Sequence, residues 1–202
     1  MALGAGSVSP LQMVGAYSVL ANGGYRISPY LISRITDSEG RVLAAANPIL
    51  AGNAAARVID ERNAFIMSSL LREVVRSGTA VRAQSLNRDD IAGKTGTTND
   101  SHDAWFAGYQ PKIAAVTWVG YDQPRKLGDR ETGGGLALPI WISYMDKALK
   151  NVPQEAPVVP SGLVEIDGDW YYAEITPDTG ITSVGLEENP NGAPIEQGVR
   201  TN

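Results

Sequence analysis

The residues best suited to chemistry in this chain are Lys94, Thr95 and Gly96, which lie in the string IAGKTGTTND at residues 91–100. Lys94 offers a positive charge to an anionic group, and the threonine hydroxyls offer directed hydrogen bonds. Gly96 lets the backbone of a ligand approach closely. On a strand, Lys94 and Gly96 face one side and Thr95 and Thr97 the other, and a ligand along the edge can meet both sets. The triplet therefore predicts a site for a carboxylate-bearing ligand; the alternative is a solvated lysine beside a glycine bulge.

A phosphate-binding loop is a competing interpretation of the same residues. Gly93-Lys94-Thr95 resembles the end of such a loop, but the loop requires a glycine five residues before Gly93, where this chain has Arg88. The residues that follow Thr95 also do not begin a good helix. We therefore reject nucleotide binding through this motif.

Patterns of apolar residues predict the elements that position the triplet. A helix should begin after Ser9 and end at Gly23-Gly24, and a second should begin at Asp60 and end at Gly78. Short loops then separate three apolar strands, which implies antiparallel neighbours. These strands span residues 90–97, 104–109 and 113–121, and a closing helix spans residues 138–149. The third strand is almost continuously apolar, so we expect it to be central and covered on both faces.

Turn and linker signals divide the chain. Hairpins are expected around residues 37–40 and around Asp167-Gly168. Prolines after Lys150 mark a linker, and the end of the chain is polar. We therefore predict an α+β fold, an antiparallel sheet covered by helices with a small C-terminal hairpin. The expected parts are a main domain over residues 1–150, a linker and hairpin over 151–182, and a flexible tail over 183–202.

Composition narrows the possible functions. The net charge is −5 over 202 residues, which argues against a nucleic-acid partner, and the absence of cysteine excludes a thiolate nucleophile and a cysteine-ligated zinc site. No apolar run approaches the ~20 residues of a membrane helix, and no signal peptide is evident. We expect no cofactor and no metal, because the single histidine, His102, fits a solvated loop better than a metal site.

Several other side chains are interpreted as structural. Trp105 and Phe106 are expected in the core, and Trp118 and Trp141 between the sheet and the closing helix. The pair Asp89-Asp90 is expected in a solvated turn.

Longer strings around the triplet carry a family resemblance. They are DAWFAGY at 103–109, VTWVGYD at 116–122, PLQM at 10–13, ANGGY at 21–25, SGTA at 77–80, TGG at 132–134 and PIW at 139–141. Taken in their order along the chain, they resemble the class A penicillin-binding proteins, the bifunctional glycosyltransferase/transpeptidases of bacterial cell walls, and most closely the 1A type. The resemblance runs from about residue 3 to residue 149, the C-terminal part of the transpeptidase domain.

The resemblance implies a function, D,D-transpeptidation that crosslinks peptidoglycan stem peptides ending in D-alanyl-D-alanine, with acylation by β-lactams as a side reaction. Lys94 and Thr95 would bind the carboxylate of the stem peptide or the antibiotic. Thr97 would lend its backbone amide to the oxyanion hole, and Gly96 and Thr98 complete the set of substrate- and β-lactam-binding residues. The resemblance also implies the periplasmic side of the bacterial inner membrane, reached through an N-terminal anchor that this sequence lacks.

The chain departs from the family at the nucleophile. The family's active-site serine begins a Ser-x-x-Lys motif, and no serine here has lysine three residues later; examples are Ser7 before Pro10, Ser69 before Arg72 and Ser143 before Asp146. Ser85-Leu86-Asn87 fits the second motif, Ser-x-Asn, in letters only, because it lies too close to the strand. We therefore expect no catalytic residue in this chain and no activity of the chain alone.

The missing half of the transpeptidase domain is then an expected partner, and the apolar surface and strand edge it would cover favour self-association. Two other functions stay open. One is a non-catalytic module that holds peptide or wall fragments along the strand edge, and saturable binding of a D-alanyl-D-alanine peptide without turnover would favour it. The other is a fragment of a D,D-carboxypeptidase, which the long match to the 1A type opposes.

Overall fold

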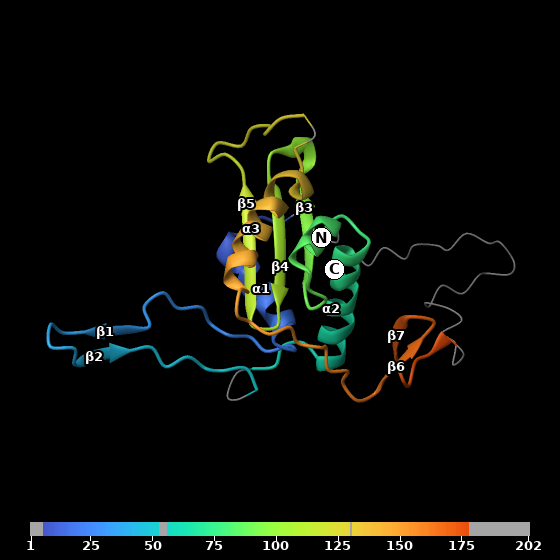
Figure 1. Cartoon of the computed structure of the whole chain (residues 1–202), viewed down its shortest axis with the longest axis horizontal. Helices are drawn as coiled ribbons and strands as arrows, with labels where there is room; N and C mark the ends of the chain where they lie inside the picture. The colour runs from blue at the N-terminus through green and yellow to red at the C-terminus, as the bar shows by residue number, and fades with distance from the viewer. Residues whose placement is uncertain (1–5, 53–55, 130, 178–202) are drawn as a thin grey trace, which may run out of the picture. The chain divides into compact units, whose positions relative to one another are not determined.

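The computed structural model describes residues 6–52, 56–129 and 131–177 (Figure 1). The elements, with η marking short 3-10 or π-helical turns, are α1 Pro10–Ala21, β1 Arg34–Thr36, β2 Val42–Ala45, α2 Glu61–Arg76, η1 Val81–Leu86, β3 Ala92–Thr97, η2 Asn99–Ser101, β4 Ala104–Gln110, β5 Ile113–Val119, η3 Gly133–Ala137, α3 Leu138–Ala148, β6 Leu163–Ile166 and β7 Asp169–Tyr172. Antiparallel sheets combined with helices confirm the α+β prediction. The chain divides into two compact units, Met1–Ser161 and Gly162–Asn202.

Both predicted helix starts are confirmed by their caps. Ser9 precedes α1, where its hydroxyl accepts a hydrogen bond from the Gln12 amide at 3.2 Å and the Gln12 side chain accepts one from the Ser9 amide at 2.8 Å. Such a capping box satisfies two amides that the first helical turn leaves unpaired. Asp60 caps α2 by accepting from the Arg62 amide at 3.0 Å. The closing helix α3 also begins where the sequence places it, with Pro139 in its first turn.

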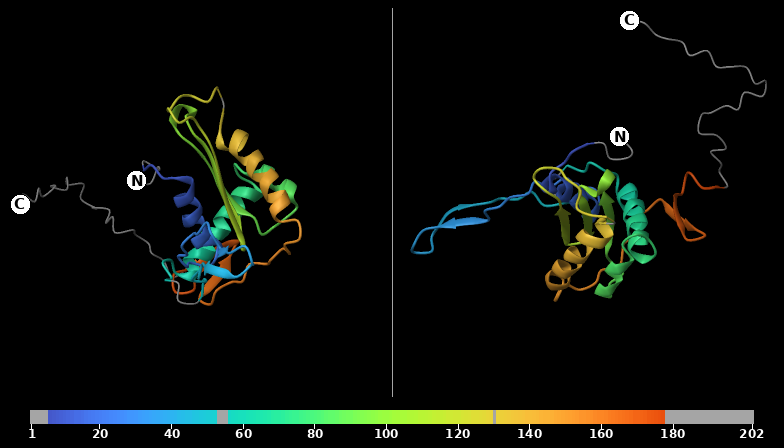
Figure 2. Two further views of the ribbon diagram at one scale, coloured as in Figure 1. Left: turned by 90° about the vertical axis from the view of Figure 1, so that its left-hand side faces the viewer. Right: turned by 90° about the horizontal axis from the view of Figure 1, so that it is seen from above.

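The main sheet has the order β3-β4-β5, and all its neighbours are antiparallel. The prediction that residues 113–121 form a central strand is wrong, because β4 lies in the middle and β5 pairs with β4 alone among the described strands. The prediction that this strand is covered on both faces is confirmed. Helices α1 and α3 lie on opposite faces of the sheet (Figure 2, left), and both contact β5. Helix packing on two faces therefore accounts for the apolar run that suggested a central place.

Most of the core lies between the sheet and α3. Phe106 and Trp141 are fully buried, and their ring centroids are 4.9 Å apart at a steep angle. The Trp141 indole N–H donates to the Ala115 carbonyl at 3.0 Å, which satisfies its polar atom inside the core. A smaller cluster on the opposite face joins Leu71 of α2 and Tyr109 of β4 to α1. These contacts confirm the predicted packing of Phe106 and Trp141.

Three predictions about single side chains are wrong. Trp118 is 37% exposed, because the register places it opposite Trp105 on the face that does not meet α3. Trp105 is only half-buried for the same reason. Asp90 is 5% exposed and paired with Arg88, so it does not lie in a solvated turn.

The hairpins form where the turn signals predict them. Asp167 and Gly168 both have positive φ, 53° and 89°, which the tight turn between β6 and β7 requires. The first hairpin joins β1 to β2 as an antiparallel pair around the turn predicted at residues 37–40. The predicted tail at 183–202 lies outside the described residues. In the described part of the chain, no helix is both long and apolar enough to cross a membrane.

Candidate functional site

Strand β3 presents the Lys94-Thr95-Gly96 triplet at an edge of the main sheet, since β4 is its one partner among the described strands. The Thr98 amide donates to the Asp103 carbonyl at 3.1 Å, so residues 98 and 103 form a hydrogen-bonded pair. The next pair, Thr97 with Ala104, is then the kind whose amides turn away from each other. The Thr97 N–H therefore faces the open edge of β3.

The Lys94 ammonium has no carboxylate partner within the described part of the chain. Its Nζ donates to the carbonyl of Thr95 at 2.8 Å and lies 3.3 Å from the Thr95 hydroxyl. The side chain is exposed. Its positive charge is therefore held beside the strand by neutral oxygens only, and it is available to an incoming anion.

Two neighbouring segments orient the threonine hydroxyls of β3. The Thr95 hydroxyl lies 2.7 Å from the hydroxyl of Thr79, and the Thr97 hydroxyl accepts from the Gly133 amide at 3.1 Å. A Cβ at position 133 would collide with the backbone oxygens of Gly96 and Trp105, so only glycine permits this approach. Thr79 and Gly133 are not identifiable as site residues from the sequence alone, although the strings SGTA and TGG that contain them carry part of the family resemblance.

Thr98 differs from the other predicted binding residues, because it lies just after β3 and its hydroxyl bonds within the following loop. Its hydroxyl accepts from the Asp103 amide at 2.8 Å and thereby closes the loop between β3 and β4. The Asp103 carboxylate in turn accepts from the Trp118 indole N–H at 2.8 Å. The loop at this end of the strand is therefore built from side chains that also face the site.

A cavity of about 700 Å³ runs along β3. Its walls are residues 94–98 on one side, Ser7, Pro10, Met13 and Tyr17 on another, and Asp103, Trp105, Ala107 and Trp118 across the sheet. This size falls within the range of small-molecule sites, roughly 300–1,000 Å³. Burial raises the pKa of Tyr17, so its hydroxyl keeps its proton. Among the described residues, the lining offers a ligand the Lys94 ammonium, several hydroxyls and two indole rings, and the Asp103 carboxylate beside them accepts from Trp118.

The candidate nucleophiles are few in this cavity. Of the residues that line the cavity, Ser7 carries a serine hydroxyl. The residue three positions later is Pro10, so Ser7 does not begin a Ser-x-x-Lys motif. Ser85 is exposed in η1 and Asn87 follows in a left-handed conformation, and neither lines the cavity. His102 lies in the loop after η2. Across residues 6–52, 56–129 and 131–177, no group of three or more His, Asp or Glu side chains could hold a metal ion.

Comparison with known protein families gives one match that covers most of the chain. The model of the penicillin binding protein transpeptidase domain matches residues 1–144. Among curated proteins, penicillin-binding protein 1A of Neisseria lactamica is 47% identical over 193 residues, which cover 96% of this chain and 24% of that protein. The chain thus spans about a quarter of the length of this relative.

Solved structures agree in fold. The crystal structure of penicillin-binding protein 1A from Haemophilus influenzae superposes with a TM-score of 0.75 at 36% identity, over 79% of this chain and 29% of that one. The penicillin-binding protein PonA1 from Mycobacterium tuberculosis superposes with a TM-score of 0.61 at 29% identity, over 79% of this chain and 42% of that one.

Proposed function

This chain belongs to the penicillin-binding protein transpeptidase family, and on that premise we propose that it forms the carboxylate-binding wall of a peptidoglycan D,D-transpeptidase cleft. The ligands are stem peptides ending in D-alanyl-D-alanine, and β-lactams that occupy the same place. The reaction belongs to the periplasmic side of the bacterial inner membrane. The observation that carries this proposal is the exposed Lys94 ammonium, without a carboxylate partner in the described chain, beside two oriented hydroxyls at an open strand edge.

Each residue of the edge has a separate task. Lys94 neutralises the terminal carboxylate of the ligand, and the Thr95 hydroxyl donates to the same group. The outward Thr97 amide donates to the oxygen that becomes negative when the scissile carbonyl is attacked. Gly96 leaves room for the ligand backbone beside the half-buried Trp105. Thr98 shapes the end of the cavity through its bond with Asp103.

The attacking serine comes from outside residues 1–202 in this account, because no serine of the chain begins a Ser-x-x-Lys motif. That serine would form a bond to the penultimate D-alanine carbonyl and release the terminal D-alanine. An amine of a second stem peptide would then displace the serine. The chain alone is therefore inactive, and its partner in the reaction is the other part of a transpeptidase domain.

Binding of the carboxylate can be tested without chemistry. We expect an N-acetylated peptide ending in D-alanyl-D-alanine to shift the backbone amide signals of Thr95 and Thr97 in a saturable way. The same peptide with an amidated C-terminus removes the charge that Lys94 neutralises, and it should shift them far less. Equal shifts with both peptides, or shifts confined to other strands, would show that the β3 edge does not read the carboxylate.

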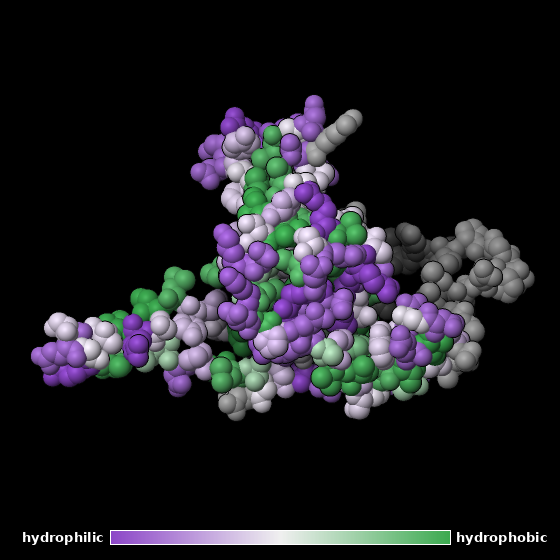
Figure 3. Space-filling view, in the orientation of Figure 1, coloured by the Kyte–Doolittle hydropathy of each residue, from purple (hydrophilic) through white to green (hydrophobic). Residues whose placement is uncertain are grey.

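We also propose that the isolated chain self-associates through exposed apolar surface. Every residue of β1 and β2 is exposed, with Val42 at 54% and Leu43 at 67%, and hydrophobic surface is visible on this hairpin and along the sheet (Figure 3). Contiguous apolar patches drive association in water. Light scattering should show dimers or larger species that the substitution Leu43→Lys reduces. A monodisperse monomer would contradict this prediction.

A further inference from the structure

A second cavity, of about 540 Å³, lies at the other end of the sheet from the Thr95–Thr97 edge. Its walls are formed by the end of α1, one side of α2, the start of β3, the end of β4 and the segment 155–160 that follows α3. Tyr17 lines the first cavity and Tyr109 the second, and their rings meet edge to face with centroids 6.2 Å apart. The two cavities are therefore separate sites on one face of the sheet.

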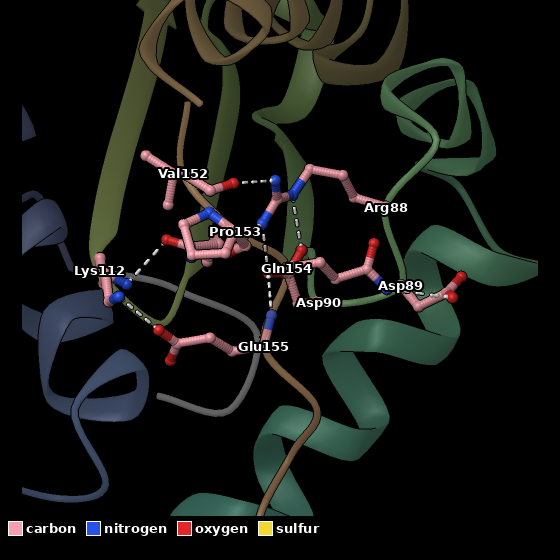
Figure 4. A network of polar contacts seen from close by, with 9 residues as sticks. Arg88, Asp89, Asp90, Lys112, Val152, Pro153, Gln154 and Glu155 are labelled. Carbon is pink, nitrogen blue, oxygen red and sulfur yellow. Dashed lines mark hydrogen bonds and ion pairs between the residues drawn. The ribbon is translucent and has the colours of Figure 1, made fainter. Parts of the chain in front are cut away.

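A network of polar contacts fixes the outer wall of the second cavity (Figure 4). Arg88 donates to the Val152 carbonyl at 2.7 Å, and Asp90 accepts from the Glu155 amide at 3.1 Å. The ammonium of Lys112 lies 2.6 Å from the Glu155 carboxylate. The acidic side chains that line the cavity, Glu61, Asp90 and Glu155, are each paired with a cation: Arg57, Arg88 and Lys112 respectively.

The cation on the α2 side of the cavity is not paired in this way. Arg72 is half-buried, and no carboxylate of the described residues lies within ion-pair distance of it. Its guanidinium lies 5.7 Å from the centre of the Phe65 ring. Burial lowers the pKa of Arg72 because its guanidinium loses hydration, and the neighbouring Tyr109 opposes this shift. An anion bound in the cavity would replace the hydration that the Arg72 guanidinium loses on burial.

A buried hydroxyl pair adjoins the same space. The hydroxyls of Ser68 and Tyr109 are 2.7 Å apart, and these residues are 8% and 4% exposed. Burial raises the pKa of Tyr109 to about 12, so it stays protonated at neutral pH. One of the two hydroxyl hydrogens is used within the pair, and the other remains able to donate to a ligand.

We propose that this second cavity binds a small carboxylate with an apolar body. The guanidinium of Arg72 would take the carboxylate in the two-point geometry that arginine favours, and the Ser68–Tyr109 pair would donate to one carboxylate oxygen. Phe65 and the prolines of the segment 155–160 would contact the apolar body. The proposal concerns residues other than those of the β3 edge, so it stands or falls separately from the transpeptidase function.

Titration of the chain with benzoate, and with benzamide as its neutral counterpart, tests this site by NMR. We expect saturable shifts of the Arg72 side-chain N–H and of the Ser68 and Tyr109 signals with benzoate, and at least about tenfold weaker binding of benzamide. Arg72→Gln should weaken benzoate binding by a similar factor. Arg76→Gln is the matched control, since Arg76 is an exposed arginine of the same helix already paired with Glu73, and it should leave binding unchanged.

Tyr109→Phe gives a second readout if Arg72→Gln does not fold, because it removes one hydroxyl and keeps the ring. We expect severalfold weaker benzoate binding with a well-dispersed spectrum. The proposal is overturned by equal shifts with benzoate and benzamide, by Arg72→Gln binding like the unmodified chain, or by the absence of a saturable shift.

Discussion

Replacing Lys94 with alanine is expected to slow acylation by penicillin roughly 30- to 1,000-fold in a polypeptide that joins this chain to a Ser-x-x-Lys segment. The reason is the loss of the Lys94 ammonium, the cation that lines the β3 cavity among the described residues, which leaves the antibiotic carboxylate without its counter-charge. Truncating one partner of a buried, hydrogen-bonded charge pair costs about 2–5 kcal/mol, and the lower part of that range applies here because Lys94 is exposed before the ligand binds. The rate of covalent labelling by fluorescent penicillin, followed over time on denaturing gels, measures the effect.

The control for Lys94 is Lys147→Ala, which removes an exposed lysine from α3. This variant keeps the same net charge as Lys94→Ala and should label at the unmodified rate. If the two variants slow labelling equally, the effect comes from overall charge, and if neither does, Lys94 does not hold the carboxylate. Either result would contradict the proposal that Lys94 binds the carboxylate of the ligand.

Arg88→Met is expected to lower the free energy of unfolding by about 3–5 kcal/mol, because it leaves the Asp90 carboxylate buried without a cation. The side chains of Arg88 and Asp90 are 12% and 1% exposed, and their closest atoms are 2.6 Å apart. Arg88 also bonds the carbonyls of Val152 and Pro153, so its loss frees the segment after α3 (Figure 4). Urea denaturation followed by circular dichroism measures the change.

A double variant and an exposed pair give the controls for Arg88. Arg88→Met with Asp90→Asn removes both charges but keeps an oxygen that can accept from the Glu155 amide, so it should recover part of the loss. Arg41→Met breaks the pair between Arg41 and Asp37. The Arg41 side chain is 74% exposed, so this variant should change the free energy of unfolding little. Equal losses for Arg88→Met and Arg41→Met would contradict the buried-pair account.

Local sequence signals predicted the parts of the fold that local chemistry determines. Ser9 and Asp60 cap the helices they precede, and Asp167-Gly168 forms the turn that its positive φ values require. Residue types alone made the Lys94 triplet a candidate carboxylate site, with a solvated lysine beside a glycine bulge as the alternative. The resemblance to the family then indicated which ligands the strand would bind, namely stem peptides and β-lactams.

Contacts between distant residues account for the failures. Arg88 reaches the Val152 carbonyl 64 residues away, so nothing near Asp90 in sequence indicates that it is buried. Trp118 faces the cavity because of its register with Trp105, and a shift of one residue would have turned it toward α3. Thr79 and Gly133 orient the β3 hydroxyls from 16 and 36 residues away. Pairing and register of this kind are set by tertiary packing, which the pattern of one segment does not contain.

Incubation with fluorescent penicillin, followed by denaturing electrophoresis, tests most directly the claim that this chain binds the ligand but does not attack it. A polypeptide that also carries a Ser-x-x-Lys segment serves as the positive control in the same gel. We predict a covalent band for that longer polypeptide and none at the mass of this chain. A covalent band at the mass of this chain would contradict the account, because it would place a nucleophile within residues 1–202.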